Sequence, residues 1–530
     1  MVSSPASHTG GTDKDARSTV DHAQVLRNAP TAAPHWDRAE REDMGDAAPH
    51  STFLYTPWKS KEPPACQQQY LRIVKRGNGA IRELSATALG NMMWGCGQTN
   101  TGNTLLYQEI LRQSLAKLAS FSSEGVAKLI WGMVTLRYYN EDLLENIRTY
   151  YEQRMGEFDA DSAAVLLWSL SKTKESDTLL DLMRRSLTSL AEKIERLSGC
   201  GCTKLWELLG GLQLFDEGFL TRLGAHTDHC LITLLPEELG NILWSCSALR
   251  FKPVCFGAMS TKAFRILKAV EIAGSGKPLA EQVSSAADGS MPQVPEDELS
   301  KAVPKDIPAF LYTVVQAFSI LSMNDRMGQA ATLRLARCAG SVVSDLTHMQ
   351  VVNLALSFCA LQIFERAFFE PAWPVIEQNR NMNIREIKML FTVDIILSHS
   401  NTSLRGTPTF QQWLKETIQD GGGQGIKQKT SCEDEMSVLL EELGEKHSRT
   451  IHNINIALVE KKIALVCFPE SSYLAGGGES RVGQSAAQST FLQCMGWRVI
   501  PVRLARFTRL ATLKKKKEFL RESIAELDEA

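Results

Sequence analysis

An apolar frame of seven residues that recurs along the chain constrains its fold more than any other feature. The frame occupies residues 89–95, 126–132, 163–169 and 239–245. Its tryptophans Trp94, Trp131 and Trp168 stand 37 residues apart, and Trp244 holds the same place in the fourth copy. A constant interval of this size is typical of helical-repeat proteins. One helix pair of this length cannot bury its apolar face alone, so we expect the pairs to stack on one another.

Helix-start signals precede the frame in most copies. An apolar residue is followed by a Ser, Thr or Asp at Leu84-Ser85, Phe121-Ser122, Phe158-Asp159 and Leu346-Thr347. Such residues open helices because the side-chain oxygen accepts a hydrogen bond from an unpaired backbone N–H of the first turn. One copy departs from this pattern, with Leu235 in the cap position and Pro236 in the first turn. A second amphipathic helix is expected after each first helix, as over residues 104–118 and 141–151.

Weaker copies extend the array to about seven units. Residues 205–211 carry glycine in the tryptophan place, residues 311–317 and 351–357 are degenerate copies, and an eighth copy is a candidate near Ile387. The repeated tryptophans could serve as stacking platforms for bases. Their fixed place in an apolar helical frame favours packing in the core instead.

Composition shifts divide the chain into four parts. Residues 1–80 are expected to be largely disordered, and the acids within them give no transit-peptide signal. Residues 81–420 form the predicted solenoid, interrupted by a Gly-, Ser- and Pro-rich insertion near 274–304 that we expect to be disordered. A linker is predicted over residues 421–445, which begins with a glycine run. Residues 446–528 form the C-terminal block.

The C-terminal block changes from helical to strand periodicity. Short apolar runs bounded by Gly and Pro predict strands around residues 454–458, 461–468 and 495–502. Residues 484–494 predict a helix between the second and third strands, and residues 512–527 predict a basic closing helix. The predicted fold class is therefore mostly α, with an α-solenoid followed by a small α/β domain.

Charge within this block is one-sided. No acidic residue occurs from Ser480 to Lys517, although the whole chain has a net charge of only −2. A local field of one sign suits a phosphate backbone, so the block predicts a nucleic-acid-binding face. The candidate RNA-binding residues are Arg481, Arg498, Arg503, Arg506, Arg509, Lys514, Lys515, Lys516 and Lys517.

The sequence predicts neither a metal site nor a cofactor. Walker, dinucleotide-binding and kinase motifs are absent, and no apolar run is long enough to span a bilayer. The twelve cysteines are scattered, which favours a reducing compartment over a disulfide framework. One cluster resembles a metal site, but its spacing matches no common zinc module. Its members are Cys200, Cys202, His226, His229 and Cys230.

Residues 454–524 resemble the RAP domain, an RNA-binding domain abundant in apicomplexans and found in organellar proteins. The resemblance is carried by Lys-Ile-Ala-Leu-Val at 462–466, the helix at 484–494, Met-Gly-Trp-Arg-Val-Ile-Pro-Val at 495–502 and Lys-Glu-Phe-Leu at 517–520. The upstream array is similar to the repeats of octotricopeptide and FAST kinase-like organellar proteins. The resemblance implies binding to single-stranded or structured organellar RNA, with other ribonucleoprotein components as further partners and no membrane. It implies a mitochondrial location, or alternatively a plastid.

RAP domains are similar to the PD-(D/E)XK nuclease fold, which raises the question of catalysis. The family commonly places a Glu and an Asp where this chain has Val466, Phe468 and Pro469, while Glu460 and Glu470 lie nearby in another register. Metal-dependent nucleases need carboxylates to hold Mg²⁺. We therefore expect a non-enzymatic protein acting in RNA processing, stability, rRNA maturation or translation. The alternatives are a metal-dependent RNA endonuclease and a helical-repeat protein scaffold.

Overall fold

The computed structural model describes residues 81–100, 104–173, 177–274, 303–321, 328–400, 402–421, 431–449, 454–475 and 480–528. The described chain is mostly helical, with a small three-stranded sheet near the C-terminus. The mostly α prediction is confirmed. The disorder predicted for residues 1–80, and for nearly all of the insertion near 274–304, lies outside the described residues. No described helix is long and apolar enough to cross a membrane.

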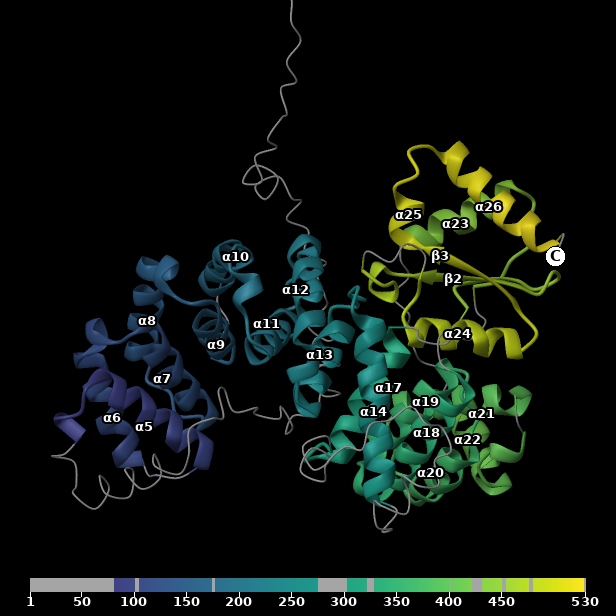
Figure 1. Cartoon of the computed structure of the whole chain (residues 1–530). Coiled ribbons are helices and arrows are strands. Elements are labelled where there is room, and N and C mark those ends of the chain that lie inside the picture. Colours follow the sequence, from purple (N-terminus) through teal and green to yellow (C-terminus); the bar gives the residue numbers. More distant parts are fainter. Residues whose placement is uncertain are drawn as a thin grey trace, which may run out of the picture. The chain divides into compact units, whose positions relative to one another are not determined.

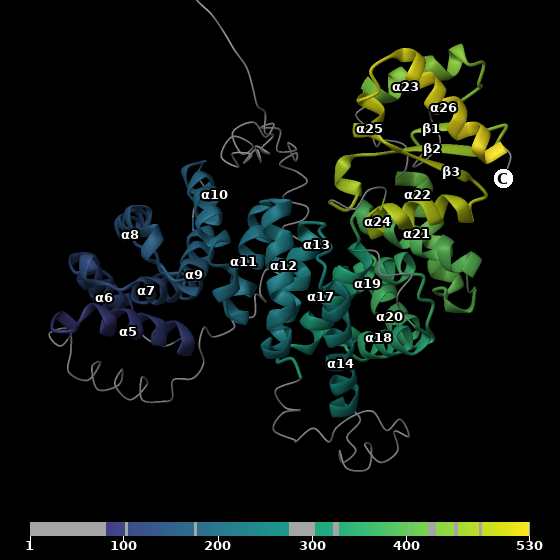
Figure 2. The ribbon, with the colours of Figure 1, turned by 45° about the horizontal axis from the view of Figure 1, so that its top comes forward.

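The helices upstream of the sheet come in pairs (Figure 1). The first helices of the pairs, which carry the sequence frame, are α5 (Ala86–Thr99), α7 (Ser123–Thr135), α9 (Ala160–Ser171), α11 (Gly199–Leu212), α13 (Pro236–Ala248), α17 (Ile307–Ile320), α19 (His348–Ala360) and α21 (Ile384–Ser400). The second helices are α6 (Thr104–Ala116), α8 (Glu141–Arg154), α10 (Asp177–Ala191), α12 (Glu217–Cys230), α14 (Phe256–Gly274), α18 (Gln329–Ser341), α20 (Arg366–Gln378) and α22 (Pro408–Gly421). Each first helix packs against the next first helix, from α5 to α21 (Figure 2).

The predicted caps open these helices. The side-chain oxygens of Ser85, Ser122, Asp159 and Thr347 each accept a hydrogen bond from the backbone N–H three residues on, at 3.2, 3.1, 2.9 and 3.4 Å. Helix α13 has no Ser, Thr or Asp cap, so the backbone N–H groups at its start are satisfied in another way. Pro236 has no N–H to satisfy, and the Glu238 carboxylate accepts from the Leu235 N–H at 2.8 Å.

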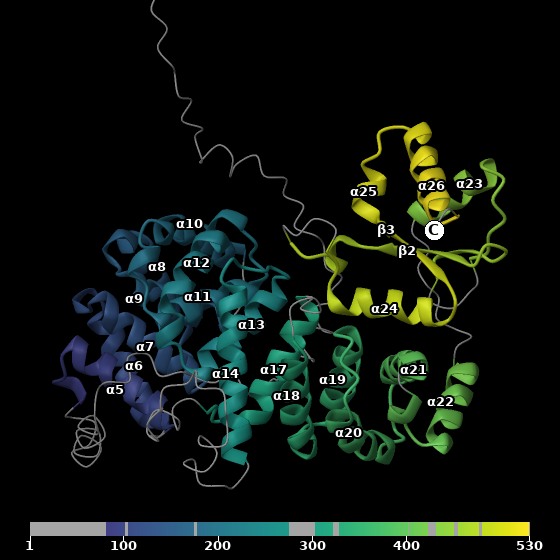
Figure 3. The same cartoon turned by 45° about the vertical axis from the view of Figure 1, so that its right-hand side comes forward.

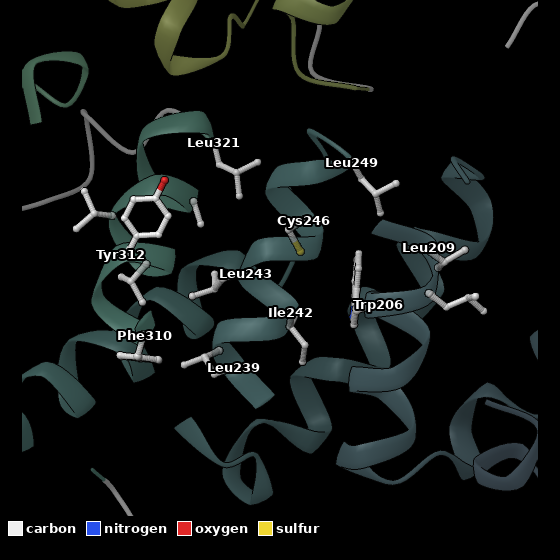
Figure 4. Packing of buried hydrophobic residues seen from close by; sticks show 14 of the residues in the cluster. Trp206, Leu209, Leu239, Ile242, Leu243, Cys246, Leu249, Phe310, Tyr312 and Leu321 are labelled. Carbon is white, nitrogen blue, oxygen red and sulfur yellow. The ribbon is translucent and has the colours of Figure 1, made fainter. Parts of the chain in front are cut away.

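The frame tryptophans pack in the layer between successive first helices. Trp94, Trp131 and Trp168 are 6%, 1% and 1% exposed, so the packing interpretation is confirmed for these three. Trp244 is half-buried. Figure 4 shows this layer near α13, where Trp206, Leu243 and Phe310 project from three successive first helices. Side chains buried in this way join neighbouring units into one core.

The sheet consists of β1 (Ile456–Leu458), β2 (Ile463–Phe468) and β3 (Arg498–Arg503), in the order β1-β2-β3. Strands β1 and β2 are antiparallel, whereas β2 and β3 are parallel. Parallel strands require a long crossover, which α24 (Gly483–Cys494) supplies. The three strands and this helix were each predicted from the sequence, and the structure confirms them.

Strand β2 is buried on both faces, which explains its continuous apolar run. Ile463 and Leu465 face a small core formed with α23 (Ser431–Glu442) and α26 (Leu513–Asp528). The alternate residues of β2, Ala464, Val466 and Phe468, belong to the other core. That second core includes α24 and continues into the helical repeats, and Figure 3 shows α24 between the sheet and the repeats. Side chains of a strand alternate between faces, so one strand serves two cores.

The structure differs from the linker prediction over residues 421–445. Residues 431–442 form α23, whose Cys432, Met436, Leu439 and Leu440 contact the sheet and α26. These apolar residues stand at helical spacing, but acidic residues between them make the segment polar in composition. The part of the linker at 422–430 lies outside the described residues.

The C-terminal block docks on the repeats through α24. This helix packs against α17, α19 and α21, where the rings of Phe391 and Phe491 lie 6.1 Å apart, edge to face. At Gly483 an added Cβ would stand 2.2 Å from the carbonyl oxygen of Ser319, so only glycine allows this approach. The backbone carbonyl of Arg250, which follows α13, accepts from the Ala475 N–H at 2.8 Å. The sequence boundary near residue 446 therefore does not separate two independent cores.

Candidate nucleic-acid interface

The nine predicted RNA-binding residues lie on or beside β3, α24, α25 (Leu504–Thr508) and α26. The structure divides them into two groups. Five have their charged groups engaged by other parts of the chain, and these are Arg481, Arg498, Arg503, Lys516 and Lys517. Four of the nine are exposed to solvent, whatever their contacts, and these are Arg506, Arg509, Lys514 and Lys515. The positive charge of residues 480–517 is thus partly neutralised by glutamates from other parts of the chain.

Two of the engaged arginines have structural roles. The guanidinium of Arg481 donates to the Ser489 hydroxyl and lies 5.2 Å from the Phe468 ring centroid. Burial lowers the pKa of Arg481. The guanidinium of Arg498 donates to the carbonyl of Leu527, at the end of α26, and to that of Lys461 at 3.0 Å. Both side chains hold elements of the block together.

The acids that neutralise the lysine run come from α23. Lys516 pairs with Glu435 at 2.7 Å, and Lys517 pairs with Glu442. These glutamates are seven residues apart, about two turns of α23, so they lie on one face of the helix. They precede the lysines by 81 and 75 residues in the chain. The pairs join α23 to α26, while Lys514 and Lys515, in the first turn of α26, are exposed.

An open recess lies at the end of β3 and is lined by three arginines. It has a volume of about 340 Å³ and is lined by Glu470, Arg503, Ala505, Arg506, Arg509 and Leu510. Helix α25 begins directly after β3 and has only five residues, so its Arg506 falls one turn from Arg503, and Arg509 falls about one turn further on. The local chain geometry therefore places three guanidinium groups around one hollow.

Glu470 shows the electrostatic preference of this recess. Its carboxylate accepts from the Arg503 Nε at 2.9 Å, and Arg503 also lies 4.6 Å from the Tyr473 ring centroid. The hydrogen bond from Arg503 lowers the pKa of Glu470, and the charges of Arg509 and Arg250 lower it further. The side chain of Glu470 is half exposed, at 51%. A carboxylate is thus stabilised as an anion where an external anion could also bind.

The positions that would hold a catalytic metal in the nuclease alternative are distributed unfavourably. Val466 and Phe468 are buried in the apolar core. Glu460 pairs with Lys446 at 3.2 Å and lies before β2, whereas Glu470 lies after it. At about 3.3 Å per residue, the six residues of β2 separate these carboxylates by roughly 20 Å. Glu460 and Glu470 therefore cannot share one Mg²⁺ ion.

The first helices carry a polar row that sequence reasoning missed. The Lys128 ammonium donates to Asn91 at 2.8 Å, and the Asn241 amide donates to Glu207 at 2.7 Å. All four residues occupy the third place of the repeat frame, which is the signal that could have identified them. The buried Lys204 completes the second pair, with its ammonium 3.2 Å from Glu207. These groups bind one another, so the row ties adjacent units together.

Comparison of the sequence with family models and with curated proteins gives no match. The functional argument for this chain therefore depends on its own residues and geometry.

Proposed function

We propose that the protein is an RNA-binding α-solenoid with a RAP-like C-terminal domain, and that it binds the RNA backbone at the arginine recess without catalysing a reaction. The observation that carries the proposal is the convergence of Arg503, Arg506 and Arg509 on one open hollow. Planar guanidinium groups bind phosphate through paired hydrogen bonds, which makes arginine well suited to such a site.

The charges around the recess indicate how a phosphate would be held. Arg506 and Arg509 are exposed and line the recess, so a phosphate can reach them from solvent. Arg503 is bound to Glu470, so a phosphate competes with this carboxylate for the same guanidinium. Lys514 and Lys515, at the start of α26, provide exposed positive charge for neighbouring phosphates. The packed first helices support the solenoid part of the proposal, because stacked helix pairs are the way such arrays bury their apolar faces.

The test is a filter-binding titration of single-stranded RNA with the full-length protein over a range of salt concentrations. The double variant Arg506→Ala/Arg509→Ala removes two charges at the recess. The matched control, Arg184→Ala/Arg366→Ala, removes one arginine from α10 and one from α20. The side chains of Arg184 and Arg366 are 63% and 70% exposed. Each phosphate contact contributes about 0.7 to the slope of log affinity against log salt for a single strand. The recess variant should reduce that slope by about 1.4, while the control should leave it unchanged.

Equal losses in the two double variants would show that binding follows net charge and not the recess. RNA binding that is absent from the unmodified protein, together with capture of defined proteins by the repeats, would favour the scaffold alternative. Mg²⁺-dependent cleavage that Glu470→Gln abolishes would favour the endonuclease. Organellar RNA is the proposed substrate class, with a mitochondrial location and a plastid as the alternative. Crosslinking RNA to the protein in cells and sequencing it would identify both the transcript and its compartment.

A further inference from the structure

Two cysteines and one histidine, all possible metal ligands, converge between α11 and α12. Cys202 lies in the first turn of α11, while His226 and Cys230 lie one turn apart on the last part of α12. Their ligand atoms all lie within 4.8 Å of one another. The two Sγ atoms are 4.0 Å apart, and the Cys230 Sγ is 3.6 Å from the His226 Nε2.

These separations match those of a tetrahedral zinc site. Zinc–sulfur bonds of about 2.3 Å and zinc–nitrogen bonds of about 2.0–2.1 Å imply about 3.8 Å between two sulfur ligands and about 3.6 Å between sulfur and nitrogen. The observed 4.0 and 3.6 Å differ from those values by about 0.2 Å or less. The third separation, from the Cys202 Sγ to the His226 ring nitrogen, is within 4.8 Å, so an ion between the three atoms needs a movement of about 1 Å or less.

We propose that Cys202, His226 and Cys230 bind one Zn²⁺ ion that clasps α11 to α12. Two thiolates and an imidazole are a ligand set that zinc prefers over the harder divalent cations. Without an ion, the His226 Nε2–H donates to the carbonyl oxygen of Leu197 at 2.9 Å, and the Cys230 thiol lies 3.8 Å from the same oxygen. Zinc binding replaces the Nε2–H bond, with the ring proton on Nδ1, and a water molecule completes the tetrahedron.

The surroundings hold the ligands in place before an ion arrives. The buried Trp206 indole donates at 3.0 Å to the hydroxyl of Thr227, which is next to His226 and itself donates to the Leu223 carbonyl at 2.7 Å. This bond fixes α12 against α11 one turn beyond Cys202. A site with ligands oriented in this way loses less conformational freedom when it binds.

The structure also selects three ligands from the five candidates of the sequence. His229 is exposed, and its ring centroid is 6.4 Å from that of His226. Cys200 lies outside the converging set. Cys230 and His226 are half-buried, so an ion can enter from solvent.

The inference is tested by titrating reduced, metal-free full-length protein with Co²⁺, which reports thiolate ligation through its charge-transfer absorption. We expect one Co²⁺ per chain, with the visible bands of a tetrahedral site, and displacement by Zn²⁺. Cys202→Ser, His226→Asn and Cys230→Ser should each weaken binding by at least about 100-fold, since losing even an outer hydrogen-bond partner of a ligand costs about 10 to 100-fold. Cys200→Ser and His229→Asn are the matched controls and should bind as the unmodified chain does.

A second measurement uses the unmodified chain and so does not depend on how the variants fold. Zn²⁺ should protect the half-buried Cys230 from alkylation, while the half-buried Cys494 of α24 should react as before. Absence of the charge-transfer band, equal loss of binding in Cys200→Ser, or alkylation of Cys230 at an unchanged rate would each overturn the assignment. A Cys202–Cys230 disulfide that persists in reducing buffer would overturn it as well.

Discussion

Two glycines in the same place of the repeat frame should respond oppositely to one added methyl group. Gly95 follows Trp94 in α5, and Gly132 follows Trp131 in α7. A Cβ on Gly95 would meet nothing within 4 Å. A Cβ on Gly132 would stand 2.4 Å from the carbonyl oxygen of Met93 and 2.7 Å from its carbonyl carbon. Those atoms belong to the backbone of α5, so they can move only if the two helices separate.

The expected magnitudes follow from two opposing effects. Replacing glycine by alanine inside a helix stabilises the helix by about 1 kcal/mol. Overpacking against a fixed neighbour costs about 1–3 kcal/mol. Gly95→Ala should therefore raise the free energy of unfolding by up to about 1 kcal/mol. Gly132→Ala loses that gain to the clash, so the difference between the two variants should equal the overpacking cost, about 1–3 kcal/mol.

Urea denaturation followed by circular dichroism measures this difference in the full-length protein. The midpoint should rise for Gly95→Ala and fall for Gly132→Ala. Hydrogen exchange then locates the effect, because faster exchange should be confined to α5, α7 and their neighbours. Gly132→Ala with a midpoint as high as that of Gly95→Ala would refute the close packing of the first helices on which the argument depends.

Three further predictions concern other contacts. Glu207→Ala should lower the free energy of unfolding by about 3–5 kcal/mol, since it leaves the buried Lys204 ammonium without its partner; a midpoint shift in urea far smaller than this would contradict the pairing. Hydrogen bonding from Arg112 lowers the pKa of Glu109 from 4.5 to about 2, so its contribution to stability is present above about pH 4.5 and is lost as pH falls toward 2; thermal unfolding of Glu109→Gln should depend less on pH in that window. Phe491→Ala should cost about 3–5 kcal/mol and increase hydrogen exchange in β2 and β3, whereas unchanged exchange would argue against docking through α24.

Local features of the fold were predictable because they depend on residues within a turn or two of one another. Ser122 marks the start of α7 because its hydroxyl reaches an N–H three residues away. The tryptophan interval predicted the repeat, and the buried Trp131 confirms its packing role. The apolar run of β2 predicted a strand. It did not predict which elements cover the two faces of that strand, because a continuous run by itself does not show what covers it.

The candidate sites were less predictable because their members are far apart in the chain. The absence of acids from 480 to 517 suggested an unbroken basic face, yet Glu470 and Glu435 approach it from other elements. Helix α23 was also missed, because acidic residues separate its apolar residues in the sequence. Its apolar face is recognised only when α26 and the sheet are seen to cover it.

The sequence by itself determined the repeat period, the helix starts, the strands and the position of the basic segment. Each follows from side chains acting on backbone or neighbours at short range. Only the tertiary structure decided which arginines are exposed at the recess, and which three of five Cys and His residues come together. Ion pairs and ligand sets form between residues dozens of positions apart, so the packing of α11 on α12 and of α26 on α23 sets them.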